Sequence, residues 1–478
     1  MALVTFSYAG GETAVDVPAG TTLLQAAIRA KLTPDAPCGG RGTCGKCTAI
    51  LDGRAVLACQ TPVTEDCRAV LPQRGADVIL ESTLDASCTA DGTDDYVLAF
   101  DVGTTTVAGF LLDGKTGAQL ASASALNPQT AYGADVISRI RYALQSGQQE
   151  LQDCIRQTLS RLAQQMTRSA GICPERITRG CLVGNTAMHH LLLGIDPKPL
   201  ATPPYMPNVR EAMEVPFGEH CRMRVLPNIA GFVGADTTAC LSALEFDRLE
   251  PVSLLIDIGT NGEMVLGNRH RRIACSTAAG PALEGAGISC GMRGAAGAVD
   301  RVLPENGGVR LHVIGGGEAE GLCGSGLLDL TAALLELGLL DSSGRLRGRS
   351  YRLPGTEVTL TQKDVRQVQL AKAAIRVGIE LLAEKLGVPL SQIETVYLAG
   401  AFGSCLDPAS ACRIGLLPPE LLPKIRAVGN AAGAGAKRCA LSAAAFETAK
   451  TLAAETEFLE LASSPGFQER YIGALDFE

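Results

Sequence analysis

The sequence predicts a small α+β domain, a polar linker and a larger α/β unit made of two similar lobes. Three features predict this arrangement. A loop rich in cysteine and glycine lies near the N-terminus, a strand that ends in an Asp-x-Gly-Thr turn occurs twice, and a turn-rich polar segment separates the two regions. We expect the first unit at residues 1–78, the linker at 79–95, and the two lobes at 96–250 and 251–478.

The first unit begins with a pattern typical of two strands and a helix. Ala2–Tyr8 and Glu12–Val17 are predicted strands. Thr21–Lys31 is a predicted helix with Thr21 or Thr22 as its N-cap. After the cysteine loop, Thr48–Leu51 and Ala55–Cys59 predict a hairpin across Asp52-Gly53. Two strands and a helix before a cysteine loop are the order of a β-grasp ferredoxin-like domain.

Four cysteines of this unit have the spacing of a metal centre. Five, two and eleven residues separate Cys38, Cys44, Cys47 and Cys59, and the first gap is one residue longer than in the usual plant-type pattern. A [2Fe–2S] cluster needs four thiolates, and a glycine-rich loop lets backbone N–H groups turn toward the sulfides. We therefore predict a [2Fe–2S] cluster on these four cysteines. The alternatives are a zinc half-site or redox dithiol at the CxxC pair, and Cys67 as a substitute ligand.

The larger unit repeats one strand-and-turn pattern. An apolar strand leads into Asp101-Val-Gly103-Thr104-Thr105-Thr106, and 156 residues later another leads into Asp257-Ile-Gly259-Thr260-Asn261-Gly262. A duplicated fold explains the repeat. Such a turn brings a carboxylate and backbone N–H groups to one point, where the N–H groups bind phosphate and the aspartate holds Mg²⁺, directly or through water. Two turns facing each other across a cleft predict a nucleotide site.

Two further glycine-rich elements extend the predicted nucleotide site. Leu398–Gly403 follows an apolar strand, and its glycines permit close approach of an adenosine. Gly321–Gly326 opens a predicted helix whose first N–H groups can face an anion. The predicted nucleotide contacts are Gly103, Thr104, Thr105, Thr106, Gly259, Thr260, Asn261, Gly262, Gly324, Ser325, Gly400 and Gly403.

These elements resemble the phosphate-1, phosphate-2 and adenosine motifs of the ATPase superfamily of actin, chaperones and sugar kinases. The resemblance implies a two-lobed, ribonuclease-H-like ATPase in which Asp101 and Asp257 are catalytic. Placed behind a ferredoxin-like module, the motifs resemble those of reductive activators of corrinoid proteins. Other stretches that resemble this family are Gly184–His189, Ala279–Arg293 and Thr361–Asp364.

The resemblance implies an ATP-dependent electron transfer. The [2Fe–2S] cluster would take one electron from a ferredoxin or flavodoxin and pass it to an inactive Co(II) corrinoid protein of a methyltransferase system. ATP and Mg²⁺ would drive this step, and a homodimer is compatible with the resemblance. Corrinoid activators carry a small extra domain between linker and ATPase, whereas about 17 residues separate the two units here.

Other functions of the same fold stay open at this stage. A kinase of a small metabolite would not need a fused cluster. Activators of radical dehydratases or aromatic-ring reductases hold a cluster between subunits and lack the β-grasp module. An adaptor that binds nucleotide without turnover is the alternative that is not an enzyme.

Several other residues allow two interpretations each. Glu284, in a glycine-rich stretch, would position a metal-bound water as a third catalytic residue, or is a plain loop carboxylate. His189 and His190 either pack and hydrogen-bond or contact phosphate or a cofactor. Thr361 and Asp364 form a capping box. Thiols near the motifs are expected to be buried, with a second cluster shared between subunits as the alternative; they are Cys275, Cys290, Cys323 and Cys405.

Composition excludes several classes of protein. Apolar residues make up 46% of the 478 residues, which is typical of a globular chain with several cores. The net charge of −8 and the absence of Trp argue against a nucleic-acid partner. The apolar stretch Gly326–Leu340 contains Asp329 and Glu336, so it predicts an amphipathic helix and no membrane span. Without a signal-peptide pattern, we expect a cytoplasmic protein.

Overall fold

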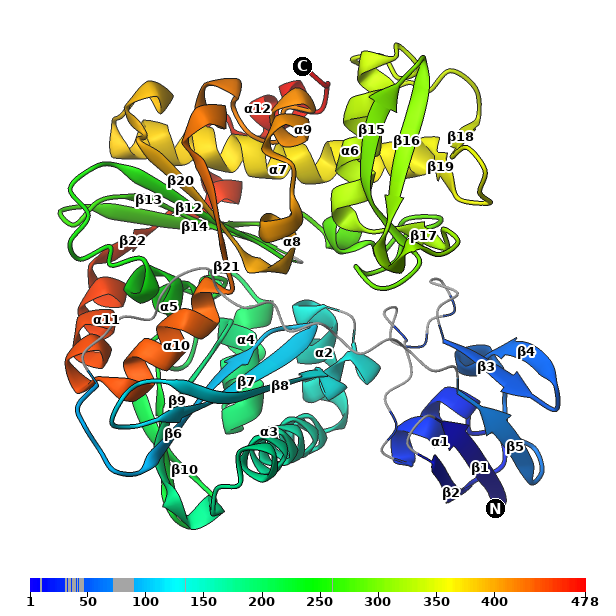
Figure 1. The fold of residues 1–478 in the computed structure, drawn as a ribbon, viewed down its shortest axis with the longest axis vertical. Helices are drawn as coiled ribbons and strands as arrows, with labels where there is room; N and C mark the ends of the chain where they lie inside the picture. Colours follow the sequence, from blue (N-terminus) through cyan, green and yellow to red (C-terminus); the bar gives the residue numbers. More distant parts are fainter. Residues whose placement is uncertain are drawn as a thin grey trace.

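Figure 1 shows the fold in a computed structural model of the chain. The structure describes residues 1–8, 11–30, 32, 36, 40, 42, 47–71, 90–133, 135–259 and 261–478. The predicted cluster ligands Cys38 and Cys44, residues 79–89 of the predicted linker, and Thr260 lie outside the described residues.

The N-terminal domain is a five-stranded sheet with one helix packed on it. Its strand order is β2-β1-β5-β3-β4, in which β1 and β5 are parallel. The elements are β1 (Ala2–Tyr8), β2 (Gly11–Val17), α1 (Leu23–Arg29), β3 (Thr48–Leu51), β4 (Arg54–Leu57) and β5 (Cys67–Val70). Thr22, one of the two residues predicted as the N-cap, caps α1 in a capping box.

Two details of this domain differ from the sequence prediction. The second hairpin strand ends at Leu57 rather than Cys59, because Ala58–Gln60 forms a 3₁₀ turn that buries Cys59. The strand β5 was not predicted, since its four residues carry no long alternating pattern. It pairs with both β1 and β3 and so closes the middle of the sheet.

The larger unit contains two six-stranded sheets that share the arrangement of five strands. The first sheet has the order β10-β11-β9-β6-β7-β8 and the second β21-β20-β12-β13-β14-β22. In each sheet the strand that comes first in the chain is central. β6 lies between the antiparallel β7 and the parallel β9, and β12 lies between the antiparallel β13 and the parallel β20. The first sheet comprises β6 (Tyr96–Val102), β7 (Thr106–Asp113), β8 (Gln119–Leu126), β9 (Ile177–Gly184), β10 (Met213–Phe217) and β11 (Cys221–Val225).

The second sheet repeats this order in the C-terminal half. It comprises β12 (Ser253–Ile258), β13 (Gly262–Gly267), β14 (Arg272–Thr277), β20 (Thr395–Ala399), β21 (Ile425–Gly429) and β22 (Thr456–Phe458). Five strands of each sheet correspond in sequence order and pairing, so the predicted duplication is confirmed at the level of topology. The shorter strands are β15 (Ala298–Glu305), β16 (Gly308–Val313), β17 (Gly321–Leu322), β18 (Ser350–Arg352) and β19 (Thr359–Thr361).

Helices form three layers around the two sheets (Figure 1). α2 (Val136–Ser146), α3 (Gln148–Ala170) and α4 (Thr186–Leu193) cover the outer face of the first sheet. α6 (Gly324–Glu336) and α7 (Gln362–Leu386) belong to the core of the second lobe. Between the sheets lie α5 (Ala235–Ala243), α10 (Ala431–Leu441) and α11 (Ala443–Glu455). The remaining helices are α8 (Gly400–Cys405), α9 (Pro408–Arg413) and α12 (Phe467–Gly473).

The middle layer ties the lobes together. One hydrophobic cluster includes Ala99 of the first sheet, Leu255 of the second and residues of α5, α10 and α11. The helices α5 and α10 approach closely at Gly435, where a Cβ atom would lie 1.9 Å from the carbonyl oxygen of Ala239. Any side chain at this position would therefore push the two helices apart.

The last residues of the predicted linker pack on this layer. The backbone N–H of Asp91 donates to the carbonyl of Leu441 at 3.0 Å, and its side chain accepts from the N–H of Ala443 at 2.9 Å. The helix α6 is buried along most of its length, so the expected exposed face is not present. Among the described residues, no helix is both long and apolar enough to cross a bilayer.

Candidate nucleotide and cluster sites

The two repeated turns lie at the carboxyl ends of equivalent central strands. Asp101 is near the end of β6 and Asp257 near the end of β12. A backbone hydrogen bond closes each turn, from the N–H of Gly103 to the carbonyl of Thr106 at 2.9 Å and from the N–H of Gly259 to the carbonyl of Asn261 at 2.8 Å. Each strand end thus presents an aspartate beside a tight turn, as the sequence predicts.

Four carboxylates gather where the lobes meet. Asp236, in the first turn of α5, and Glu263, at the start of β13, join Asp101 and Asp257. Burial, followed by repulsion between neighbouring carboxylates, raises the pKa of Asp101 and of Asp257 to about 7. Burial raises the pKa of Asp236 to about 6, and that of Glu263 also lies well above its usual value.

This carboxylate cluster fits a divalent cation bound together with phosphate. None of the four acids has an ion-pair partner among the residues that the structure describes, so their negative charge lacks a local counterion. Nor do the described residues include three acidic, histidine or cysteine side chains arranged to hold a metal on their own. Mg²⁺ commonly keeps several waters and uses one or two carboxylates plus phosphate oxygens, which matches this incomplete donor set.

Two neutral side chains contact the aspartates of the two turns. The Nδ2 of Asn430, at the start of α10, donates to Oδ2 of Asp101 at 3.0 Å and so joins a C-terminal segment to the first lobe. The Sγ of Cys240 lies 3.9 Å from Oδ2 of Asp257, and burial raises the pKa of this thiol well above its usual value. Cys240 is therefore a neutral neighbour that adds no negative charge.

Sequence reasoning missed these neighbours of the aspartates. Asp236, Cys240 and Asn430 lie outside the repeated strands, and only the middle helices bring them to the site. Glu263 follows Gly262 directly in the second motif, which was the one available signal for it. The N-terminal position of Asp236 on a helix after Gly234 was too common a pattern to indicate function.

The structure also places the predicted adenosine motif and Glu284 beside the second turn. Gly400 has a φ of +82°, and a Cβ atom there would lie 2.5 Å from Oδ1 of Asp257. Only glycine fits both the backbone conformation and the space. The Oε1 of Glu284 lies 3.7 Å from where a Cβ atom on Gly259 would be. Glu284 is thus near the second turn, where a role in positioning a metal-bound water remains a hypothesis.

Packing accounts for the predicted residues at the start of α6. A Cβ atom on Gly324 would lie 1.7 Å from the carbonyl oxygen of Leu283. The buried hydroxyl of Ser325 donates to the carbonyl of Asp300 at 2.9 Å. The nucleotide contacts expected of these two residues, and of Gly403 on α8, remain predictions.

The described part of the cysteine loop is suited to thiolate ligands. Cys47 and Cys59 are buried, and the N–H of Cys59 donates to Sγ of Cys47 at 3.4 Å. The amide of Gln60 lies 3.8 Å from Sγ of Cys59. Such donors stabilise sulfur in its deprotonated form. Cys67 differs, since burial and then Asp52 raise the pKa of its thiol, which disfavours the thiolate that a ligand needs.

The histidine pair is held by ordinary hydrogen bonds. Nδ1 of His190 lies 2.8 Å from the carbonyl of Thr186, and its Nε2 accepts from the N–H of Asn208. Nδ1 of His189 lies 2.9 Å from Nδ2 of Asn228, and burial lowers the pKa of His189 to about 3. These contacts account for His190 as a packed, hydrogen-bonded residue, whereas Nε2 of His189 is buried without a hydrogen-bond partner among the described residues.

Other motif residues have structural roles. Thr361 and Asp364 form the predicted capping box of α7, and Asp364 also accepts from the N–H of Ser289. Cys275 and Cys323 are buried, as expected. Cys290 is half-buried and Cys405 is exposed, so the expectation of burial is wrong for Cys405.

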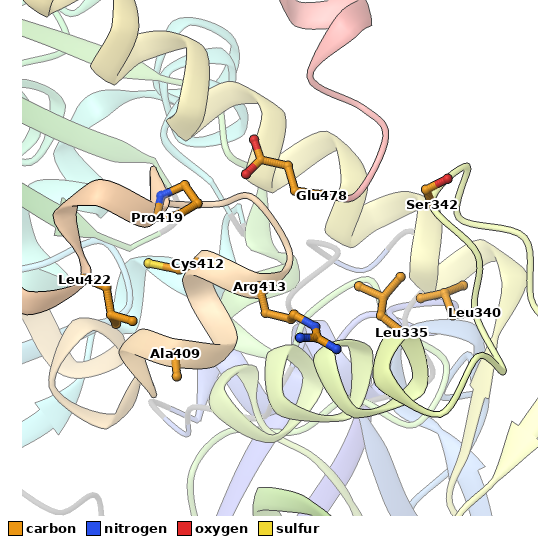
Figure 2. A pocket seen from close by; sticks show the side chains of 9 residues that line it. All are labelled: Leu335, Leu340, Ser342, Ala409, Cys412, Arg413, Pro419, Leu422 and Glu478. Atoms are coloured by element: carbon orange, nitrogen blue, oxygen red, sulfur yellow. The ribbon is translucent and has the colours of Figure 1, made fainter. Parts of the chain in front are cut away.

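A separate hollow lies on the second lobe. It measures about 580 Å³ between α6, α9 and the C-terminal residue Glu478. Figure 2 shows Arg413 extending from α9 toward the helix that carries Leu335. No predicted site residue lines this hollow. It is therefore distinct from the carboxylate cluster.

Comparison with known proteins agrees with the observed combination of folds. Residues 7–64 match the 2Fe-2S iron-sulfur cluster binding domain. Residues 96–249 match the RACo middle region, and residues 251–478 match the "C-terminal domain of RACo the ASKHA domain". The class is thus a ferredoxin-like module fused to an actin- and sugar-kinase-like nucleotide-binding unit.

Individual relatives define the family within this class. The corrinoid activation enzyme RamQ of Eubacterium limosum is 38% identical over 79% of this chain and 69% of its own length. The [Co(II) methylated amine-specific corrinoid protein] reductase of Methanosarcina barkeri is 29% identical over 80% of this chain and 77% of its own. A solved "Reductive activator for corrinoid,iron-sulfur protein" aligns with a TM-score of 0.73 at 27% identity, over 100% of this chain and 98% of that chain. The chain belongs to the RACo family of corrinoid-activating enzymes.

Proposed function

We propose that this protein is an ATP-dependent reductive activator that passes one electron from a [2Fe–2S] cluster to an inactive Co(II) corrinoid protein. The observation that carries the proposal is the cluster of four carboxylates built by both lobes, in a chain that also holds the iron–sulfur module. A nucleotide bound there would contact both lobes, so its binding would depend on their relative position.

The nucleotide half of the proposal assigns roles to the described residues. Asp101 and Asp257 would hold Mg²⁺, directly or through water, and the N–H groups of the two turns would bind phosphate. Mg²⁺, when bound, would offset the negative charge of the phosphate oxygens. Asp236 would accept a proton or orient water from α5, since its raised pKa lets it act near neutral pH. Glu284 is the proposed second water-positioning group.

The electron-transfer half assigns the cluster to Cys38, Cys44, Cys47 and Cys59. When bound there, the cluster would supply one-electron chemistry. The chain's own contribution is burial of Cys47 and Cys59 and a backbone N–H directed at sulfur. A ferredoxin or flavodoxin is the proposed donor, the cytoplasm the proposed location and a homodimer the proposed assembly.

Energetics explain why a nucleotide is needed. Reduction of a Co(II) corrinoid is uphill from ordinary donors, and a gap of about 0.2 V corresponds to about 5 kcal/mol for one electron. ATP can offset such a gap only if it changes the affinity for one redox state of the partner. A two-lobed site that closes on nucleotide provides a conformational change able to do this.

The proposal is tested by following cobalt reduction directly. The reconstituted protein, a reduced ferredoxin and a Co(II) corrinoid protein would be mixed, and Co(I) followed by its absorption. We expect Co(I) only with Mg-ATP. Cys47→Ser should abolish it and leave nucleotide turnover intact. A wild-type protein that turns over ATP but phosphorylates a metabolite instead of reducing cobalt would contradict the proposal in favour of a kinase.

A further inference from the structure

Arg139 is a fully buried cation behind the first phosphate-type turn. It lies in the first turn of α2, and its side chain has no exposed surface. Its guanidinium donates from Nε to the carbonyl of Gly133 at 2.9 Å, from Nη1 to Sδ of Met188 at 3.3 Å and from Nη2 to the carbonyl of Thr104 at 2.5 Å. All three acceptors are neutral.

The charge of Arg139 has no carboxylate in contact within the part of the chain that the structure describes. Its surroundings include Asp135 on its own helix and Glu284 from the second lobe, which act on it only at longer range. Burial lowers the pKa of Arg139 to about 9, so the side chain is still protonated at neutral pH. A buried charge is expensive unless an opposite charge balances it.

The same region fixes three successive carbonyl groups of the first turn. Nδ2 of Asn127 donates to the carbonyl of Gly103 at 2.8 Å, and the backbone N–H of Asn127 donates to the carbonyl of Thr105 at 2.8 Å. Arg139 holds the carbonyl between them, that of Thr104. The carbonyls of Gly103, Thr104 and Thr105 are therefore all held by residues of the first lobe.

This arrangement sets the direction of the N–H groups. In a planar trans peptide the carbonyl and the following N–H point in opposite directions. With the carbonyls of Gly103 and Thr104 held by the lobe, the N–H groups of Thr104 and Thr105 face away from it. A hydrogen bond from a cation also polarises the Thr104 carbonyl, which makes the N–H of Thr105 a stronger donor.

We propose that Arg139 is a positioning residue for the first phosphate-binding turn, and that the polyphosphate of the bound nucleotide balances its charge. Arg139 does not touch the ligand. It acts through the Thr104–Thr105 peptide and through its positive charge behind it. This inference rests on the proposed nucleotide site and specifies how the first lobe recognises phosphate.

The test compares Arg139→Met with Arg141→Met. Arg141 lies on the same helix but is exposed, so its replacement removes the same charge without touching the turn. Affinities of the full-length protein for Mg-ATP, Mg-ADP, AMP and adenosine would be measured by calorimetry. We expect Arg139→Met to lower the affinity for Mg-ATP by about tenfold or more, as loss of a charged hydrogen bond implies. The affinity for adenosine should hardly change. Arg141→Met should leave all four affinities near wild type.

A conservative variant separates positioning from simple unfolding. Arg139→Lys keeps the charge and should recover part of the Mg-ATP affinity, and Asn127→Asp, which loses the donor to Gly103, should again weaken phosphate-bearing ligands selectively. An equal loss for ATP and adenosine, or no loss at all, would overturn the role of Arg139. A wild-type chain that does not bind Mg-ATP would instead contradict the nucleotide site itself.

Discussion

The two repeated turns carry equivalent aspartates but have different surroundings. Behind the first turn, Asn127 and Arg139 hold three successive carbonyls from within one lobe. Beside the second turn lie Glu284 and Gly400 of the second lobe, of which only Gly400 comes from a segment distant in the sequence. Duplication preserved the strand and its carboxylate, while the supporting contacts diverged.

This difference indicates that the two lobes would contribute differently to nucleotide binding. The first turn has fixed peptide planes, which suits a rigid cradle for phosphate. The second is next to the predicted adenosine motif, so the proposed nucleotide contact there would depend on how the C-terminal segments are packed. A closed site would need interactions from both turns. The following predictions test whether the two turns contribute equally to nucleotide binding and turnover.

The largest effect is expected from the aspartates themselves. Asp101→Asn and Asp257→Asn should each lower ATP turnover by about 100-fold or more, because each removes a negative charge that would hold the metal on the phosphates. Measured by phosphate release, the double variant should be little worse than either single one, since both serve one bound metal. Asp113→Asn, at the half-buried last residue of β7, is the matched control. Mild and additive losses would mean that the two turns do not form one site.

Asp236→Asn should separate activity from stability. This change removes one of the mutually repelling carboxylates, so the nucleotide-free protein should become more stable by about 1 kcal/mol while turnover falls at least about tenfold. Thermal unfolding and phosphate release measure the two effects. Lower stability combined with normal turnover would show that Asp236 is a structural residue of α5.

The carboxylate cluster should also determine how folding stability and Mg-ATP affinity depend on pH. The folded-state pKa values of about 7 for Asp101 and Asp257 lie above the ordinary value of 3.8, so the folded protein binds these protons more tightly than the unfolded one. Their contribution to stability is therefore greatest at low pH and is lost as pH rises toward 7. Mg-ATP affinity should rise over the same range, with proton release on binding detectable by calorimetry in different buffers. A flat profile between pH 5 and pH 8 would contradict the raised pKa values.

The smallest effect is expected at the contact between the C-terminal segment and the first lobe. Asn430→Ser keeps a cap for α10 but removes the donor to Asp101, so Mg-ATP affinity should fall by about threefold. Because the hydrogen bond from Asn430 lowers the pKa of Asp101, its loss should move the pH midpoint of binding upward. An unchanged midpoint would mean that Asn430 only caps its helix.

Local patterns predicted the first strands of each unit, the helix of the small domain, the starts of α6 and α7, and the two aspartates. The alternation of strands, the cysteine spacing and the two Asp-x-Gly turns are all contained within short windows of sequence. Asp236, Cys240 and Asn430 could not be found in this way, because helices from different parts of the chain carry them to the lobe junction. The role of Arg139 could not be predicted from the sequence for a related reason. A basic residue in a helix is usually exposed, and only packing shows that this one is buried.

The central claim is that nucleotide at the lobe junction controls the encounter with a corrinoid partner. The most direct measurement is the affinity of the reduced protein for a corrinoid protein in the Co(II) and methylated states, with and without Mg-ATP. We predict that the Co(II) form binds more tightly and that Mg-ATP weakens this complex, since an effector drives transfer only as far as it discriminates between states. Affinities that are equal for both cobalt states and independent of nucleotide would contradict the account, even if the protein hydrolyses ATP.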